Sequence, residues 1–186
     1  MTRLWLVRHG PTHARAFLGH IDLPADLSDV AGVARLAAVL PEAPIVSSDL
    51  RRAVQTADAL ACGRDRLPHE AGLREMDFGD WDGRAANEID DPTLRLFLEE
   101  PGTRRAPGGE SWNHLDARVS AAIGRLAQGR ADLIVVAHMG TILTQWARAA
   151  RLVPYDALAQ VVAPLSLTRI DLRGGRAHAV SINQRA

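Results

Sequence analysis

The stretch LIVVAH at residues 133–138 carries the strongest fold signal in the chain. It is a continuous apolar run rich in β-branched side chains, which is typical of a strand covered on both faces, as in a parallel sheet. The run ends on a histidine, His138. A second apolar run, TRLWLV at residues 2–7, leads to Arg8 and then to His9. The two runs predict buried strands whose carboxyl ends each present an imidazole.

Further short apolar runs alternate with segments of helical periodicity, which is typical of a layered α/β domain. Additional strands are expected at residues 45–46, 165–172 and 177–182, and helices at residues 28–40, 50–61, 92–98, 111–126 and around 142–146. We therefore predict an α/β fold in one domain spanning residues 1–186. It is a three-layer sandwich whose central sheet is mostly parallel and is flanked by helices.

Cap-type residues mark where several of these helices begin. Ser48 and Asp49 are expected to cap the second helix, Asp91 precedes a proline at the first position of another, and Ser111 opens the longest. The irregular segment at residues 64–84 is long for a loop in a compact domain, and such loops usually carry function.

Composition excludes several classes of function. The chain has 186 residues, 47% hydrophobic and 24% charged, as expected for a globular protein. Its 22 cationic and 22 anionic side chains cancel, so no overall field favours nucleic acid or an anionic membrane. All of the cations are Arg, which excludes lysine Schiff bases and P-loop lysines but suits bidentate binding of phosphate.

Cys62 is the only cysteine, so no disulfide within the chain, cysteine-rich zinc site or iron–sulfur cluster is expected. His9 and His13 lack a third ligand, and we predict neither a metal nor a cofactor. The first apolar run is too short for a signal peptide, and no run reaches the length of a membrane span. These observations favour a cytoplasmic protein.

Arg8, His9 and Gly10 place a fixed cation beside an imidazole, with a glycine that allows backbone to approach a ligand. A helix begins near residue 50 with Arg51 and Arg52, and helix N-termini favour anions. Neighbouring helical side chains point about 100° apart, so only one of these two arginines is expected to face a ligand. Together these features outline a phosphate pocket.

Five segments resemble the histidine phosphatase superfamily, the phosphoglycerate mutase-like proteins, and they follow the family order along nearly the whole chain. They are RHGxT at residues 8–12, SxLxRAxQTA at 48–57, LxExxFGxWxG at 73–83, GGES at 108–111 and VAHxG at 136–140. The resemblance implies a phosphoglycerate mutase-like fold and phosphoryl transfer without a metal.

The resemblance also implies a role for each matching residue. His9 is the nucleophile that becomes phosphorylated, Arg8, Arg52 and His138 hold the phosphoryl oxygens, and Glu75 is the general acid. Neutral imidazole is a competent nucleophile near pH 7, and phosphoryl transfer depends mostly on positioning and charge neutralisation. An arriving phosphate dianion favours the protonated carboxyl that a general acid needs.

Some candidates depart from the family pattern or compete with it. Thr12 and Arg15 are further candidates for substrate binding, although Arg15 stands where many relatives have Asn, and Pro11 stands where an acidic residue or Gln is common. Three aspartates close to Glu75 are alternative acids: Asp77, Asp80 and Asp82. Arg104 and Arg105 lie in a Pro/Gly loop from which they are hypothesised to contact the leaving group.

The function predicted is hydrolysis of a small phosphorylated metabolite, and α-ribazole phosphatases are among the short members that the chain resembles. A phosphoglycerate mutase is the main alternative, although mutases are typically longer. A protein phosphohistidine phosphatase and a non-catalytic phosphate-binding module are less favoured, since the Glu75 loop, the nucleophile and the acid are all present. No GxSxG or GxGxxG motif supports a serine hydrolase or a dinucleotide site. Nucleic acid and membrane partners are not expected, and both a monomer and a homodimer remain open.

Overall fold

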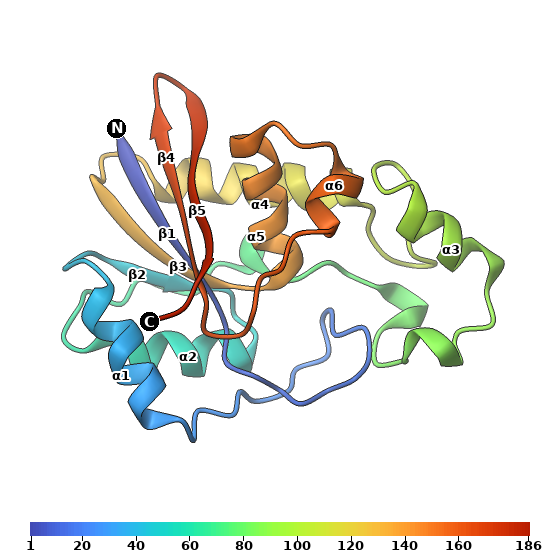
Figure 1. Cartoon of the computed structure of the whole chain (residues 1–186), viewed down its shortest axis with the longest axis horizontal. Helices are drawn as coiled ribbons and strands as arrows, with labels where there is room; N and C mark the ends of the chain where they lie inside the picture. The colour runs from blue at the N-terminus through green and yellow to red at the C-terminus, as the bar shows by residue number, and fades with distance from the viewer.

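A computed structural model describes residues 1–186 (Figure 1). The strands are β1 (Thr2–Arg8), β2 (Ile45–Ser47), β3 (Asp132–Ala137), β4 (Leu167–Arg173) and β5 (Arg176–Gln184). The α-helices are α1 (Val30–Val39), α2 (Arg51–Ala61), α3 (Pro92–Glu99), α4 (Trp112–Leu126), α5 (Met139–Ala150) and α6 (Pro154–Leu158). Short 3₁₀ helices are η1 (Ala71–Leu73), η2 (Gly79–Trp81) and η3 (Ala86–Glu88).

The five strands form one sheet in the order β2-β3-β1-β4-β5. β1 and β2 both pair in parallel with β3, whereas β4 is antiparallel to its neighbours β1 and β5. All strands except β4 therefore point in the same direction, and the sheet is mixed. The predicted α/β class and the mostly parallel strand direction are confirmed, with an antiparallel pairing on either side of β4.

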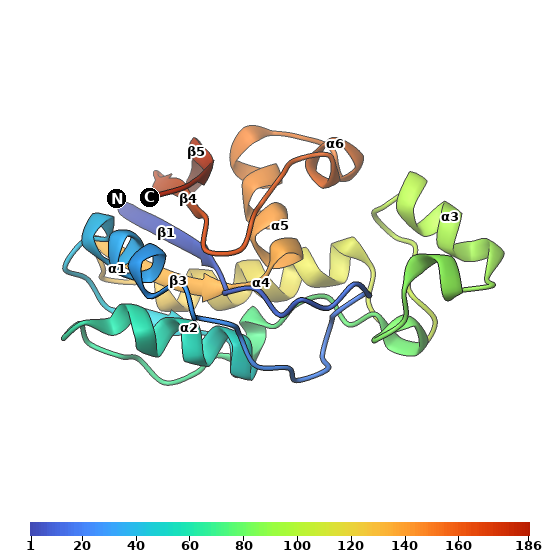
Figure 2. The ribbon, with the colours of Figure 1, turned by 60° about the horizontal axis from the view of Figure 1, so that its bottom comes forward.

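Helices cover both faces of the sheet, and alternate residues of β3 pack on opposite sides of it. Leu133 and Val135 belong to the larger apolar cluster, which includes side chains of α4 and α5. Ile134 and Val136 belong to the smaller cluster, with side chains of α1 and α2. Figure 2 shows the resulting three layers. The apolar run at residues 133–137 is therefore continuous because both faces of β3 are buried, as the sequence predicts.

One predicted helix cap is wrong. The residue before α2 is Leu50, which makes no side-chain cap, and Ser48 and Asp49 lie outside the helix. The Ser48 hydroxyl lies next to His138 instead, and Asp49 pairs with Arg74. The other two caps are confirmed, since Asp91 accepts from the backbone N–H of Thr93 and Ser111 from that of His114. Asp91 and Ser111 therefore cap their helices, whereas Ser48 contacts a histidine.

The chain between η1 and α4 extends beyond the sheet and carries α3 at one end of the molecule (Figure 1). Trp81 is buried there, with its ring 5.2 Å from that of Phe97, edge to face. Phe78 lies 4.9 Å from Phe17, between ring centroids. Aromatic contacts of this kind fix a segment that has little regular structure.

Candidate active site

Three parallel strands end at the same edge of the sheet, which brings together segments that are far apart in the sequence. Arg8 is in register with Ala137, so the next residues, His9 and His138, lie side by side with ring centroids 5.0 Å apart. Ser48, which follows β2, has its Oγ 2.7 Å from Nε2 of His138. The carboxyl ends of the strands therefore form the floor of the candidate site.

His9 is buried, and its hydrogen bond fixes which ring nitrogen is free. Nδ1 lies 2.7 Å from the carbonyl oxygen of Gly10, so Nδ1–H donates and Nε2 keeps its lone pair. Burial lowers the pKa of His9 to about 3, and the charges of Arg52 and Arg8 act in the same direction. His9 is therefore a neutral imidazole with an unprotonated Nε2 at neutral pH.

His138 is fully buried at the start of α5, where Arg52 orients it. Nε of Arg52 donates to Nδ1 of His138 over 3.2 Å, so Nε2–H of the neutral ring donates to Ser48. Burial holds the pKa of His138 well below its usual range, and the neighbouring His9, Arg52 and Arg8 lower it further.

Arg52 is buried and holds a loop as well as His138. Its Nη1 donates to the carbonyl of Ile21 at 2.8 Å, and its Nη2 to that of Gly19 at 2.7 Å. Arg51 is exposed, so the prediction that only one of the two arginines turns inward is confirmed. Arg52 therefore joins the strand-end histidines to the loop at residues 18–21.

Arg8 carries a donor that no protein group satisfies. Its Nη1 donates to the carbonyl of Val162 at 2.5 Å, whereas its Nε is buried without a hydrogen-bond partner. Burial lowers the pKa of Arg8, and the charge of Glu75 opposes that shift. A buried donor without an acceptor costs about 1–3 kcal/mol, and a bound anion would satisfy it.

Glu75 is buried, and backbone N–H groups hold both of its carboxylate oxygens. Oε1 accepts from Met76 at 2.9 Å, and Oε2 accepts from Gly140 at 3.0 Å, at the N-terminus of α5. A Cβ at position 140 would lie 2.4 Å from Oε1 of Glu75, so the carboxylate holds this position only beside a glycine. The VAHxG segment therefore places both His138 and the backbone that holds Glu75.

The loop that carries Glu75 is clamped by residues that sequence reasoning missed. Nη2 of Arg118 donates to the carbonyl of Glu75 at 3.1 Å, and Nη1 to that of Arg74 at 3.0 Å. Arg118 also forms a bidentate pair with Glu110, at 2.9 and 2.6 Å. Nε2 of His20 lies 3.1 Å from the Glu75 carbonyl as well. The GGES motif contained one half of this clamp, but nothing in the sequence linked Glu110 to Arg118.

The three alternative acids have other surroundings. Asp82 accepts from the backbone N–H groups of residues 19, 20 and 21, at 2.7, 2.8 and 3.0 Å. Asp77 accepts from Gly79 at 2.9 Å, and Asp80 is exposed. Asp82 therefore fixes the same loop that Arg52 holds from its carbonyl side, whereas Glu75 accepts from the backbone that follows His138.

The remaining candidates lie apart from this group. Thr12 is half-buried and Arg15 is exposed, and neither side chain makes a hydrogen bond to the residues above. Arg104 is exposed and pairs with Glu100 at 2.6 Å, and Arg105 is also exposed. The structure thus brings together His9, His138, Arg8, Arg52 and Glu75, but it does not add these four side chains to them.

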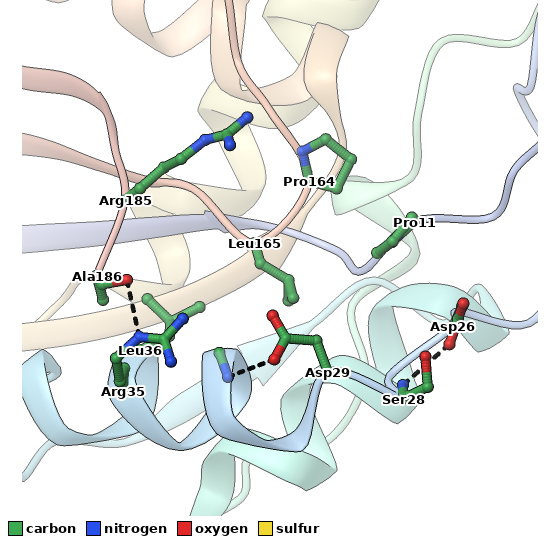
Figure 3. A pocket seen from close by; sticks show the side chains of 11 residues that line it. Pro11, Asp26, Ser28, Asp29, Arg35, Leu36, Pro164, Leu165, Arg185 and Ala186 are labelled. Carbon is green, nitrogen blue, oxygen red and sulfur yellow. Dashed lines mark hydrogen bonds between the residues drawn. The ribbon is translucent and has the colours of Figure 1, made fainter.

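A hollow of about 430 Å³ lies away from these residues, beside α1 and the C-terminal residues (Figure 3). Both signs of charge line it, and three of its four charged side chains already have protein partners, Asp26 through Ser28 and His13. Arg35 donates to the carbonyl of Ala186 at 3.2 Å, and Asp29 accepts from Gly32 at 2.9 Å. Neither histidine nor Glu75 lines this hollow, so its size does not make it the candidate site.

Two further features of the whole chain bear on function. No helix is both long enough and apolar enough to cross a membrane. No group of three or more His, Cys, Asp or Glu side chains is arranged to hold a metal ion.

A family model described as histidine phosphatase superfamily (branch 1) matches residues 4–185. The adenosylcobalamin/alpha-ribazole phosphatase of Salmonella typhimurium is 31% identical over 152 residues, covering 75% of each chain. The probable phosphoglycerate mutase GpmB of Salmonella paratyphi C is 34% identical over 149 residues, covering 73% of this chain and 69% of that one. A mycobacterial glucosyl-3-phosphoglycerate phosphatase, solved with inorganic phosphate, superposes with a TM-score of 0.85 at 28% identity, covering 100% of this chain and 98% of that one.

Proposed function

Because the chain belongs to the histidine phosphatase superfamily (branch 1), we propose that it is a metal-independent phosphomonoesterase that forms a phosphohistidine on His9. The family confirms the predicted enzyme class, a phosphatase. The observation that carries the proposal is the convergence of an unprotonated Nε2 on His9, an unsatisfied donor on Arg8 and a buried carboxylate at Glu75. The substrate is a small phosphorylated metabolite.

His9 acts as the nucleophile in the first step. Its Nε2 lone pair attacks phosphorus, and the bond from phosphorus to the ester oxygen breaks as the new N–P bond forms. The low pKa of His9 keeps the lone pair available across the neutral range. The arginine cations compensate the phosphoryl charge, the task that metal ions perform in other phosphoryl transfer enzymes.

Glu75 handles the proton in both steps. Its carboxyl group gives a proton to the departing alkoxide, which leaves as an alcohol. The resulting carboxylate then takes a proton from the water that attacks phosphorus, and the electron pair of the N–P bond returns to Nε2. The N–H groups of Met76 and Gly140 fix the position of this carboxylate between the two steps.

Residues 1–186 act as one domain in this proposal, in the cytoplasm. Both apolar clusters pack on a single sheet, and the proposed residues come from segments between His9 and His138. The mutase alternative rests on the 34% identity to the probable phosphoglycerate mutase. It differs in outcome, because a mutase returns the phosphoryl group to glycerate whereas a phosphatase releases it to water.

Hydrolysis of p-nitrophenyl phosphate in excess EDTA tests the proposal, with His9→Ala as the variant and His178→Ala, an exposed histidine, as the control. We expect activity in EDTA that falls by about 10³-fold or more in His9→Ala and is unchanged in His178→Ala. Rapid denaturation during turnover should trap an acid-labile phosphate on the wild type and on His178→Ala but not on His9→Ala. A fully active His9→Ala overturns the mechanism, and isomerisation of 3-phosphoglycerate without release of phosphate favours the mutase.

A further inference from the structure

A small apolar cavity borders the candidate general acid. Its volume is about 140 Å³, and Glu75 and Gly140 are among the residues that line it. Phe17, Phe78 and Phe97 contribute to its wall, and Glu75 is the only lining residue with a charged side chain. The cavity exposes only apolar surface, so Glu75 borders it through the hydrocarbon part of its side chain, next to the point where the chemistry is proposed to take place.

The position of Glu75 determines which part of a substrate lies in this cavity. A general acid must lie within hydrogen-bond reach of the leaving oxygen, and that oxygen is bonded to the first carbon of the alcohol. The phosphoryl group lies on the other side of the same oxygen, toward His9 and Arg8. The alcohol portion of the ester must therefore extend into space that Glu75 borders, and the apolar cavity is such a space.

We propose that this cavity is the leaving-group subsite and that the substrate is the phosphate monoester of an uncharged alcohol with a compact apolar group. This inference rests on the proposed function, because it assigns Glu75 the role of general acid. The volume sets the size of the group, since an apolar protein cavity of about 150 Å³ binds benzene. A single ring, or an aliphatic group of similar bulk, fills the space.

The same cavity disfavours an anionic alcohol. No arginine lines it, and Arg95, the one cation of α3, pairs with Glu99 at 2.8 Å. A carboxylate on the leaving group would lose its water without gaining a cation. Phosphorylated hydroxy acids such as phosphoglycerates are therefore poor substrates in this proposal.

The choice of substrates tests this inference directly. Benzyl phosphate and 4-carboxybenzyl phosphate share the same type of ester bond and differ in one charge, and ethyl phosphate lacks the ring. We expect kcat/KM for benzyl phosphate to exceed that for each of the other two by about 10- to 100-fold, as burial of one ring predicts. Equal kcat/KM values for benzyl and 4-carboxybenzyl phosphate overturn the proposal.

Two leucines of α3 supply a matched pair of variants. Leu98 is 42% exposed and lines the cavity, whereas Leu96 is 37% exposed and does not. Leu98→Arg should lower kcat/KM for benzyl phosphate by about tenfold or more. It should also narrow the preference of the enzyme for benzyl phosphate over 4-carboxybenzyl phosphate. Leu96→Arg should leave both values unchanged. Identical behaviour of the two variants contradicts the assignment of the cavity.

The outcomes separate this inference from the proposed function. If the enzyme hydrolyses p-nitrophenyl phosphate through His9 but does not distinguish the benzyl esters, the subsite assignment is wrong and the phosphatase mechanism stands. If no ester is hydrolysed, the mechanism itself fails. The inhibition constants of benzylphosphonate and methylphosphonate can also be compared, which measures binding of compounds that are not turned over. Equal inhibition constants contradict the subsite.

Discussion

Gly140 shows how one residue determines the geometry of the site. A Cβ at this position would lie 2.4 Å from Oε1 of Glu75 and 3.2 Å from a methyl group of Leu115. Either the carboxylate or the start of α5 must then move. Because α5 also begins directly after His138, the absence of a side chain at Gly140 allows the proposed acid to approach the backbone beside the histidine pair.

Gly140→Ala should therefore displace Glu75 without unfolding the protein. A misplacement of about 1 Å costs about 10²-fold in rate, and we expect a loss of this order in kcat/KM for alkyl phosphates, because kcat/KM reports only the step that forms the phosphoenzyme. The loss should be much smaller for p-nitrophenyl phosphate, because nitrophenolate leaves without being protonated. Steady-state kinetics on both substrates measure the difference.

Gly124→Ala is the control for this substitution. Gly124 lies within α4, and a Cβ there would meet no atom within 4 Å. Gly124→Ala should raise the melting temperature slightly, because alanine has the higher helix propensity, and it should leave both rates unchanged. Equal losses on alkyl and nitrophenyl esters in Gly140→Ala would show that Glu75 is not the general acid.

At the level of elements, α4 holds the loop that carries Glu75 through a single side chain. Arg118 donates to the carbonyls of residues 72, 74 and 75, and Glu110 accepts from both Arg118 and the N–H of Asp77. The side chains of Arg118 and Glu110 are mostly buried, at 25% and 19% exposure. The pair therefore acts as a positioning device for the loop and does not touch the proposed reacting atoms.

Arg118→Met keeps the apolar stem and removes the donors. It should lower the stability by about 2 kcal/mol, because it leaves carbonyls and a carboxylate unpaired. In protein that circular dichroism shows to be folded, kcat should fall while the inhibition constant for inorganic phosphate stays constant, since phosphate is bound by the His9 and Arg8 group. A purely structural role would leave kcat of the folded fraction unchanged.

Arg125→Met on the same helix is the matched control. Arg125 pairs with Glu70 at 3.2 Å with its side chain 62% exposed. Exposed pairs contribute about 0–1 kcal/mol, so neither stability nor kcat should change much. If both variants lower kcat equally, the clamp has no special relation to Glu75.

These elements also show what the sequence was able to predict. His9 and His138 follow continuous apolar runs, so their place at strand ends followed from periodicity alone. The clamp did not follow, because Glu110 and Arg118 meet only after α4 packs beside the η1 loop. Ser48 was misread as a helix cap, because the local sequence does not show whether its hydroxyl binds a backbone N–H or a histidine ring.

At the scale of the whole molecule, the site depends on three strands ending at one edge of the sheet. This topology buries His9 and His138 between cationic side chains, where neither ring is readily protonated. The strand directions were predictable from the alternation of helices and apolar runs, whereas the depth of burial depends on contacts between loops and residues that are far apart in the sequence. The loop at residues 18–21 is an example, because Arg52 binds its carbonyl groups and Asp82 accepts from its N–H groups.

This burial makes the stability of the protein depend on pH. Burial lowers the pKa of His9 to about 3 and that of His138 well below its usual value, whereas both titrate near 6.5 in the unfolded chain. Below pH 6.5 the unfolded state therefore binds more protons than the folded state, so stability rises with pH and is lost as pH falls toward the folded values. Each histidine contributes a slope of up to about 1.4 kcal/mol per pH unit.

Urea unfolding between pH 6.5 and 5 isolates this effect, because the carboxylates with lowered pKa values, such as Asp132, are ionised in both states in that range. We expect stability to fall steadily across it. His9→Gln should remove about half of the slope, since one of the two buried histidines is then absent, and His178→Gln, at an exposed position, should leave it unchanged. A slope that is the same in all three proteins would mean that the pKa of His9 is the same in the folded and unfolded states, which would contradict the lowered pKa that keeps its Nε2 lone pair available below pH 6.5.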